Sequence, residues 1–200
     1  MGQQWITPGA SSLGAEGLNA KIISYNRNVI GTLLEMASME PDYARSSFGV
    51  DRGYLSRIQA MDEKALLQAS SVALPLWRPM IASGRGGYGD MFRIVLDEAE
   101  TPAAKIKRRA FVRPFSDPIY VLVESYFYMF REIAHASVSH AAIAARVSQA
   151  EMSRFASLDI YEARQTFYNK VPKLLPLSPD PLGINTDQLS TLVRQVASSV

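Results

Sequence analysis

The stretch that decides the fold is AAIAARVSQAEMSRFASLD, residues 141–159. Two short runs of helical character are separated by a turn, and Ser148 followed by Glu151 has the spacing of a capping box, which starts a helix. A short helix, a tight turn and a second helix are the parts of a helix-turn-helix. The alternative is a pair of short helices that serves only the hydrophobic core.

An upstream stretch, GVDRGYLSRIQAMD at residues 49–62, repeats this layout in other letters. A displacement of about 97 positions aligns the two regions without a gap. The matching pairs include Glu35 and Glu132, Ala44 and Ala141, Val50 and Val147, Ser56 and Ser153, Arg57 and Arg154, Asp62 and Asp159, Pro75 and Pro172, and Pro79 and Pro176. The pattern predicts one helical module that occurs twice, and a chance alignment of two helical segments is the alternative.

The spacing of apolar residues and the positions of glycine and proline predict a mainly α fold with two helix-turn-helix-like modules in tandem and a small central β-hairpin. We expect a loose arm at residues 1–17, a first module at 18–81, a loop and β-hairpin at 82–118, a second module at 119–177, and a linker with a C-terminal helix at 178–200. The expected helices are residues 18–39, 42–48, 52–61, 63–73, 120–136, 140–146, 149–157 and 160–169, and paired prolines end each module. The hairpin is expected to join a strand at 92–97 to a strand at 105–112, after a loop at 82–91.

Each module contains apolar residues at the positions that fill the wedge between the two short helices. In the first they are Ala44, Phe48, Val50, Leu55 and Ile58, and in the second Ala141, Ala145, Val147, Met152 and Phe155. Gly49 suits the first turn. Each module also has a defect, since Arg45 stands where a small residue is favoured and Arg146 stands where the second turn favours glycine.

Polar residues fall on the outer face of each expected recognition helix. The candidate DNA-binding residues are Arg52, Ser56 and Arg57, with Gln59 beside them, in the first module and Gln149, Ser153 and Arg154 in the second. Arginine and glutamine pair with guanine and adenine edges, and serine reaches phosphate. A solvated helix face is the alternative, and Glu151 beside the second face counts against DNA contact because its charge repels phosphate.

The only dense positive cluster consists of Lys105, Lys107, Arg108 and Arg109, followed by Arg113. Along a strand these side chains would contact phosphates. A charged edge strand that resists aggregation explains them equally well.

Composition narrows the function classes. The 200 residues carry a formal net charge of +2 and no cysteine, so disulfides, thiolate catalysis and cysteine-based zinc sites are excluded. The N-terminal stretch lacks the pattern of a secretory signal and the apolar runs are too short for a membrane span, so we expect a cytoplasmic protein without membrane contact.

No sequence motif indicates a catalytic, cofactor or metal site. The glycine-rich stretch at residues 84–89 matches a dinucleotide motif by letter but lacks a strand before it and a helix after it. His135 and His140 are spaced unlike helical metal ligands. We therefore expect no catalysis and no cofactor, and an unrecognised small-molecule enzyme is the least favoured alternative.

At residues 28–80 the chain resembles FlhD, a subunit of the bacterial flagellar master regulator, and the FlhD-type activators of conjugative elements. The resemblance lies in NVIGTLLEMA, SSFGV, YLSRIQAMDEKALLQASS and LPLWRP, with Asp62 in place of the usual cap residue. It covers about a quarter of the chain, and the second half departs from it. The cysteines that bind zinc in FlhC, the partner subunit of FlhD, are absent.

This resemblance implies a transcription activator that binds promoter double-stranded DNA in a hetero-oligomer with an FlhC-like subunit and recruits RNA polymerase. In that family the FlhC-type subunit makes most of the DNA contact. The alternative is therefore an interaction subunit that does not touch DNA, in which the face around Arg57 binds a protein partner.

Overall fold

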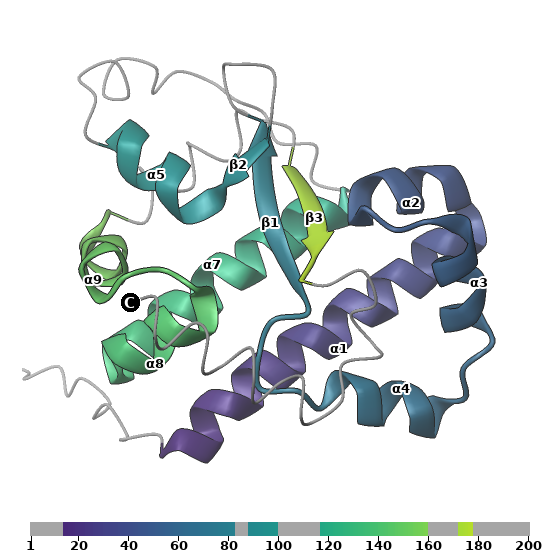
Figure 1. Ribbon diagram of the computed structural model, residues 1–200, viewed down its shortest axis with the longest axis horizontal. Coiled ribbons are helices and arrows are strands. Elements are labelled where there is room, and N and C mark those ends of the chain that lie inside the picture. The colour runs from purple at the N-terminus through teal and green to yellow at the C-terminus, as the bar shows by residue number, and fades with distance from the viewer. Residues whose placement is uncertain (1–13, 83–87, 100–116, 160–171, 178–200) are drawn as a thin grey trace, which may run out of the picture.

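The computed structural model describes residues 14–82, 88–99, 117–159 and 172–177 (Figure 1). As predicted, this part of the chain is mainly helical, with one small antiparallel sheet. The elements in chain order are α1 (Ala15–Met39), α2 (Pro41–Phe48), α3 (Arg52–Gln59), α4 (Glu63–Ser70), β1 (Trp77–Ala82), β2 (Tyr88–Asp90), α5 (Met91–Ala99), α7 (Pro118–Ala136), α8 (Val138–Ala145), α9 (Gln149–Ser157) and β3 (Pro172–Pro176). No helix in the described ranges combines the length and apolarity that crossing a membrane requires.

The two long helices α1 and α7 pack against each other along the middle of the molecule (Figure 1). Lys21 pairs with Glu132 at 2.6 Å, and the rings of Tyr25 and Tyr126 lie 5.3 Å apart between centroids. The later residue of α1, Tyr25, contacts the earlier residue of α7, Tyr126, so the two helices run antiparallel. Their apolar faces are buried because residues three and four apart lie on one side of a helix.

Asn26 joins α1 to the segment that leads into β1. Its side chain is fully buried, donates to the carbonyls of Val72 and Leu74 at 3.0 and 2.9 Å, and accepts from the N–H of Leu76 at 2.9 Å. A buried amide with these three bonds satisfies backbone groups that no strand partner reaches. It thereby fixes where β1 begins.

The sheet has the order β2-β1-β3, and both pairings are antiparallel. In β1, Arg78 lies opposite Leu175 of β3, and Met80 lies opposite Asp90 of β2. Pro79, which has no N–H to donate, lies opposite Leu174 of β3, just before the pairing with β2 begins. The central strand therefore tolerates a proline because only one of its edges is paired at that point.

The predicted hairpin is wrong in its first strand, because residues 91–99 form helix α5. The run FRIVLD is short, apolar and β-branched, and such runs do not distinguish strand from helix. Asp90 decides the outcome, since its carboxylate accepts from the N–H of Phe92 at 3.0 Å and starts the helix. Met91, Phe92, Val95 and Leu96 then form one buried helical face.

Two further predictions about the strands also need correction. The predicted loop at residues 82–91 includes strand β2, and the prolines expected to end each module lie in or beside strands β1 and β3. The predicted arm at 1–17 is too long, because α1 already begins at Ala15. Residues 1–13 of that arm, the predicted strand at 105–112, the predicted helix at 160–169 and the C-terminal segment at 178–200 lie outside the described residues.

The helix bounds recur at the predicted displacement. Pro41 and Phe48 bound α2, and Val138 and Ala145, each 97 positions later, bound α8. In the sheet, Arg78 pairs with Leu175, which is also 97 positions later. This pairing places equivalent positions opposite each other on two antiparallel strands, as an internal two-fold axis would require. That the two halves are copies of one module stays a prediction.

Candidate nucleic-acid interface

The first helix-turn-helix candidate, here called the first unit, consists of α2, the turn at residues 49–51 and α3. Gly49 adopts the left-handed conformation at φ 61° and ends α2. The carboxylate of Asp51 accepts from the N–H of Tyr54 at 2.7 Å and caps α3 as predicted. The predicted wedge residues Ala44, Phe48, Leu55 and Ile58 are buried and Val50 is half-buried.

Glycine at position 49 is required by space as well as by conformation. A Cβ atom there would lie 2.6 Å from Cδ2 of Leu175 and 3.3 Å from Cδ of Pro176. Both residues belong to β3, so the turn of the first unit packs directly on a strand from the far end of the described chain. The predicted defect at Arg45 is accommodated because its guanidinium reaches back to Asp42 at 3.0 Å.

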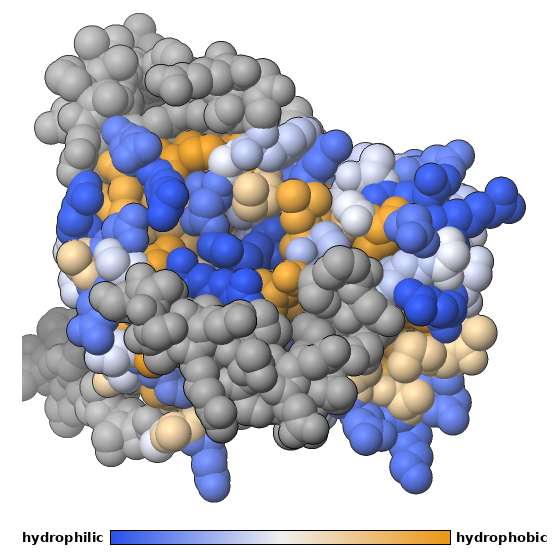
Figure 2. All heavy atoms as spheres, viewed as in Figure 1, coloured by the Kyte–Doolittle hydropathy of each residue, from blue (hydrophilic) through white to orange (hydrophobic). Residues whose placement is uncertain are grey.

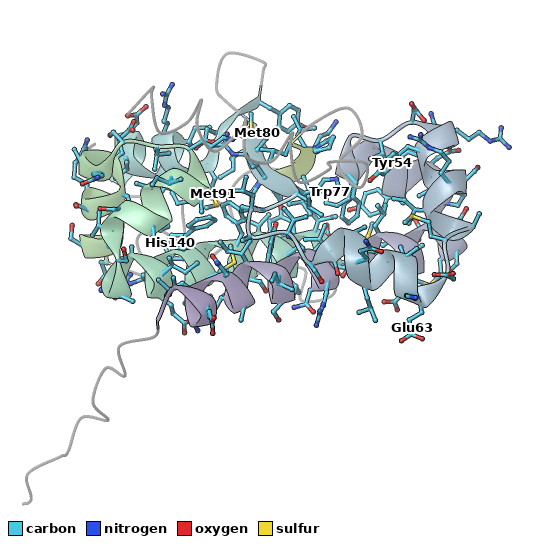
Figure 3. The ribbon with its side chains drawn as sticks, turned by 60° about the horizontal axis from the view of Figure 1, so that its bottom comes forward. Tyr54, Glu63, Trp77, Met80, Met91 and His140 are labelled. Atoms are coloured by element: carbon cyan, nitrogen blue, oxygen red, sulfur yellow. The ribbon has the colours of Figure 1, made fainter. Side chains whose placement is uncertain are left out.

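The first unit is anchored on Trp77 at the start of β1. The Trp77 ring is fully buried and meets the rings of Phe48 and Tyr54 edge-on, at centroid distances of 6.5 and 6.4 Å. Figure 3 shows Tyr54 and Trp77 side by side in the interior, with Glu63 of α4 pointing outward. Burial of these rings fixes the orientation of α3 relative to the sheet.

The second unit consists of α8, the turn at residues 146–148 and α9. Arg146 takes the left-handed conformation at φ 58°, the only non-glycine residue to do so in the described part of the chain. The predicted capping box is present, since Ser148 accepts from the N–H of Glu151 and Glu151 accepts from the N–H of Ser148. The predicted wedge residues Ala141, Ala145, Val147, Met152 and Phe155 are all buried.

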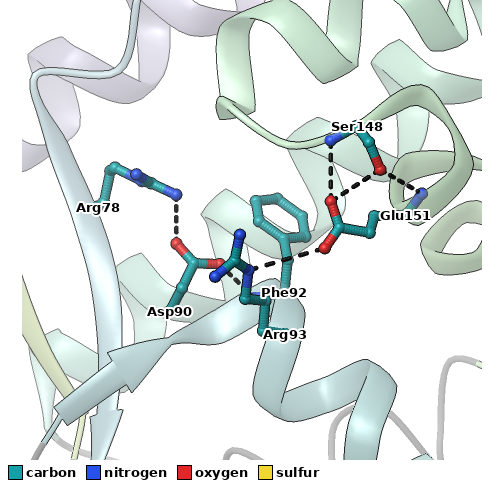
Figure 4. Close-up of polar contacts among 6 residues, drawn as sticks. All are labelled: Arg78, Asp90, Phe92, Arg93, Ser148 and Glu151. Atoms are coloured by element: carbon teal, nitrogen blue, oxygen red, sulfur yellow. Dashed lines mark hydrogen bonds and ion pairs between the residues drawn. The ribbon is translucent and has the colours of Figure 1, made fainter. Parts of the chain in front are cut away.

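An aromatic cluster anchors the second unit. The ring of Phe155 lies 4.6 Å from that of Phe92 in α5 and 4.7 Å from that of Phe127 in α7, and Phe92 lies 5.5 Å from Phe130. Arg93 of α5 also approaches Glu151 of α9 at 3.7 Å (Figure 4). Helix α5, which the sequence pattern misassigned as a strand, thus supports α9 together with α7.

The predicted contact faces are exposed in both units. In α3 the exposed residues include Arg52, Ser56, Arg57 and Gln59, and in α9 they include Gln149, Ser153 and Arg154. Arg57 lies over the ring of Tyr54, 5.5 Å from its centroid. Figure 2 shows hydrophilic residues gathered at the end of the molecule that α2 and α3 form. The predicted basic residues Lys105, Lys107, Arg108 and Arg109 lie outside the described residues.

Glu151 is engaged within the protein. Its carboxylate accepts from the Ser148 N–H at 2.9 Å and from the Ser148 hydroxyl at 2.8 Å (Figure 4). These hydrogen bonds, the one from the backbone first, hold the pKa of Glu151 below its ordinary value, with a smaller contribution from the charges of Arg93 and Arg154. The negative charge of Glu151 is therefore partly compensated by the first turn of α9 and by Arg93. This compensation weakens the repulsion between Glu151 and a DNA phosphate close to α9.

The sequence pattern did not predict a half-buried polar cluster that lies beneath the second unit. It contains Arg78 of β1, Asp90 of β2, Tyr126 of α7 and Arg146 at the turn. Asp90 forms an ion pair with Arg78 and starts α5 through Phe92 (Figure 4). The one available signal was Asp90 in front of an apolar run, which is a helix-start pattern.

Metal coordination finds no support in the described ranges, where no group of three or more His, Cys, Asp or Glu side chains is placed to hold an ion. His140 lies on α8 near the interior in Figure 3, and its N–H donates to the Ser137 hydroxyl that caps this helix. Comparisons with models of protein families, with curated proteins and with solved structures found no match to this chain.

Proposed function

We propose that this protein is a transcription regulator of the FlhD type, an activator that binds promoter DNA. Helices α3 and α9 enter the major groove, and a hetero-oligomer with an FlhC-like subunit together with contact to RNA polymerase completes the active complex. The observation that carries the proposal is the pair of three-residue turns, each followed by a capped helix with an arginine on its exposed face.

The residues assigned to base and phosphate contact are those of the two exposed faces. Arg57 and Arg154 occupy the same position in the two helices, five residues after the first exposed polar residues Arg52 and Gln149. An arginine there can donate two parallel hydrogen bonds to a guanine edge. Ser56 and Ser153 precede them and lie within reach of the backbone phosphates.

The test measures DNA affinity as a function of salt. Duplexes selected from a random-sequence pool with the whole protein serve as the probe, and affinity is expected to fall steeply as salt rises because phosphate contacts release counterions. Arg57→Ala and Arg154→Ala are each expected to cost about 1–3 kcal/mol of binding free energy. The control is Arg27→Ala, an exposed arginine of α1, which should leave affinity unchanged. Unchanged affinity in both recognition-helix variants would remove the assignment.

The second candidate function is an interaction subunit that binds a DNA-binding partner and does not touch DNA. It is favoured by large apolar side chains on the surface, with exposed fractions of 66% for Met39, 43% for Leu67 and 47% for Val121. The stacking of Arg57 on Tyr54 is also compatible with a protein contact. DNA binding that requires an added FlhC-like protein, with no loss in Arg57→Ala or Arg154→Ala, would support this function.

A further inference from the structure

We propose that Arg78, Tyr126 and Arg146 form a half-buried binding site for one oxyanion group, a carboxylate or a phosphate, beneath the second unit. This site is separate from the exposed faces of α3 and α9, and its existence does not depend on DNA binding. The residues come from three elements, β1, α7 and the turn between α8 and α9, so only the folded chain brings them together.

Four buried donor atoms in this cluster lack an acceptor within the described structure. They are Nε of Arg78, Nε and Nη2 of Arg146, and the hydroxyl of Tyr126. Native proteins pair the great majority of their buried donors, because an unpaired buried donor costs about 1–3 kcal/mol. Four unpaired donors in one cluster point to an acceptor that the described residues do not supply.

The charge of the cluster selects the ligand. Arg78 and Arg146 contribute two positive charges and Asp90 one negative charge. Asp90 is already engaged, since one carboxylate oxygen pairs with Arg78 and the other accepts from the N–H of Phe92. A single oxyanion group would neutralise the remaining charge and accept from guanidinium donors, which bind carboxylate and phosphate through parallel hydrogen bonds.

The mutual influence of these groups shows that they lie within electrostatic range. Burial lowers the pKa of Arg146, and the positive charge of Arg78 lowers it further. Burial raises the pKa of Tyr126, and the charge of Asp90 acts in the same direction. The charge of Arg78, a hydrogen bond between Arg78 and the Tyr126 oxygen, and the charge of Arg146 act in the opposite direction, so the Tyr126 oxygen already accepts from Arg78 and only its proton lacks an acceptor. Two guanidinium groups held close together without a shared carboxylate repel each other, and an oxyanion between them would reverse that repulsion.

The backbone at Arg146 supports a role for this side chain. The left-handed conformation costs a residue other than glycine about 1–2 kcal/mol, and the first unit uses glycine at the matching position 49. The Arg146 backbone is strained, and its half-buried guanidinium has two nitrogens without a hydrogen-bond partner. Proteins retain such strain mainly at positions where the side chain has a function.

The position of the cluster implies a consequence for α9. Arg146 lies two residues before Ser148, the cap of α9, and Arg78 pairs with Asp90, which starts the helix on which α9 rests. A ligand that joins Arg78 to Arg146 therefore ties the turn of the second unit to the sheet. Resting on the proposed function, such a ligand would set the orientation of the second recognition helix.

The experiment uses the full chain and follows thermal unfolding in sodium phosphate, sodium acetate and sodium chloride at one pH and one ionic strength, with titration calorimetry for any anion that stabilises. We expect the midpoint to rise with phosphate or with acetate relative to chloride, and the anion that acts identifies the class. Equal midpoints in all three salts would overturn the proposal.

Variants assign the effect to the cluster. Arg146→Gly, which suits the turn, is expected to weaken anion affinity roughly ten- to hundredfold, and Tyr126→Phe roughly two- to tenfold. Arg146→Asn, which tolerates the left-handed conformation, serves if the glycine variant folds poorly. The matched control is Arg93→Gln, which removes a neighbouring guanidinium outside the cluster and should keep the wild-type affinity. Undiminished affinity in the Arg146 variants contradicts the assignment, whatever the outcome of the DNA experiments.

Discussion

The first and second units share a first helix of eight residues, a three-residue turn and a left-handed residue at that turn, yet they are held in the molecule by different means. The first unit packs on Trp77 and places its turn against β3. The second packs on the rings of Phe92 and Phe127 and carries a half-buried charged cluster beneath its turn. Local sequence therefore specifies the helix-turn-helix layout, whereas the residues that support each unit come from distant parts of the chain.

The turn residues show the difference most directly. At Gly49 both the backbone conformation and the approach of Leu175 exclude a side chain. At Arg146 the same conformation carries a long side chain whose guanidinium lies near Arg78 and Tyr126. The turn at Gly49 therefore allows close packing. The turn at Arg146 keeps a strained backbone and places a guanidinium in the polar cluster.

The largest expected effect separates the two anchors. Phe48→Ala and Phe155→Ala should each lower the free energy of unfolding by about 3–5 kcal/mol, because each removes a fully buried ring. Phe155→Ala should lie at the upper end, since Phe155 meets two rings at under 5 Å and Phe48 meets Trp77 at 6.5 Å. Urea unfolding measures both, with exposed Leu67→Ala as the control. The reverse order would show that Trp77 provides the stronger support.

The next effect tests the two turns. Gly49→Ala should destabilise the protein by about 1–3 kcal/mol through the left-handed conformation and the contact with Leu175. Arg146→Gly should be neutral or stabilise by up to about 1 kcal/mol in chloride, because relief of strain exceeds the entropy that glycine adds to the unfolded chain. Thermal and urea unfolding measure both changes. Destabilisation by Arg146→Gly in chloride would mean that Arg146 contributes packing that outweighs its strain.

A smaller effect distinguishes the caps of α3 and α9. Asp51→Ala removes one side-chain cap and should cost about 1 kcal/mol. Ser148→Ala removes the cap and also a donor to Glu151, so we expect a somewhat larger cost, up to about 2 kcal/mol. Ser148→Thr keeps the capping oxygen and is the control. Equal costs for the two alanine variants would show that the reciprocal half of the capping box contributes little.

The smallest effect is the pH dependence of the second cap. The folded-state pKa of Glu151 is depressed, so its contribution to stability is present above its ordinary pKa of 4.5 and is lost as pH falls through the folded value. The difference in unfolding free energy between the wild type and Glu151→Gln should therefore shrink as pH is lowered from 7 toward 3. Ser148→Ala removes the hydroxyl hydrogen bond, the second cause of the lowered pKa of Glu151, and keeps the backbone N–H bond, which is the first cause, so it should reduce this pH dependence only in part. An unaltered profile in Ser148→Ala would show that the hydroxyl contributes little and would assign the shift to the backbone N–H of residue 148.

Several elements could be predicted from the sequence to within a few residues. The helices α2, α3, α7, α8 and α9 and the caps Asp51, Asp62 and Ser148 were predicted from their own letters. Each depends on groups within four positions along the chain, namely a capping oxygen, a turn residue and an apolar face with helical spacing. For the same reason the exposed positions of Arg57 and Arg154 could be predicted from helix periodicity.

Long-range partners decided the rest. The strand β1 forms around Pro79 because β3, about a hundred residues later, provides its antiparallel neighbour. The run at residues 92–97 becomes helical because Asp90 caps it and because its buried face fits the rings of Tyr126, Phe130 and Phe155. No window of sequence contains these partners.

Local sequence therefore determined two short helical pairs with arginines on their outer faces, because capping and amphipathic periodicity act over one or two turns. Only the tertiary structure decided which segments became strands, what supports each pair and that Arg78, Tyr126 and Arg146 meet. Strand pairing, ring packing and burial of charge depend on residues brought together from distant positions, and their free energies are realised only after the chain has folded.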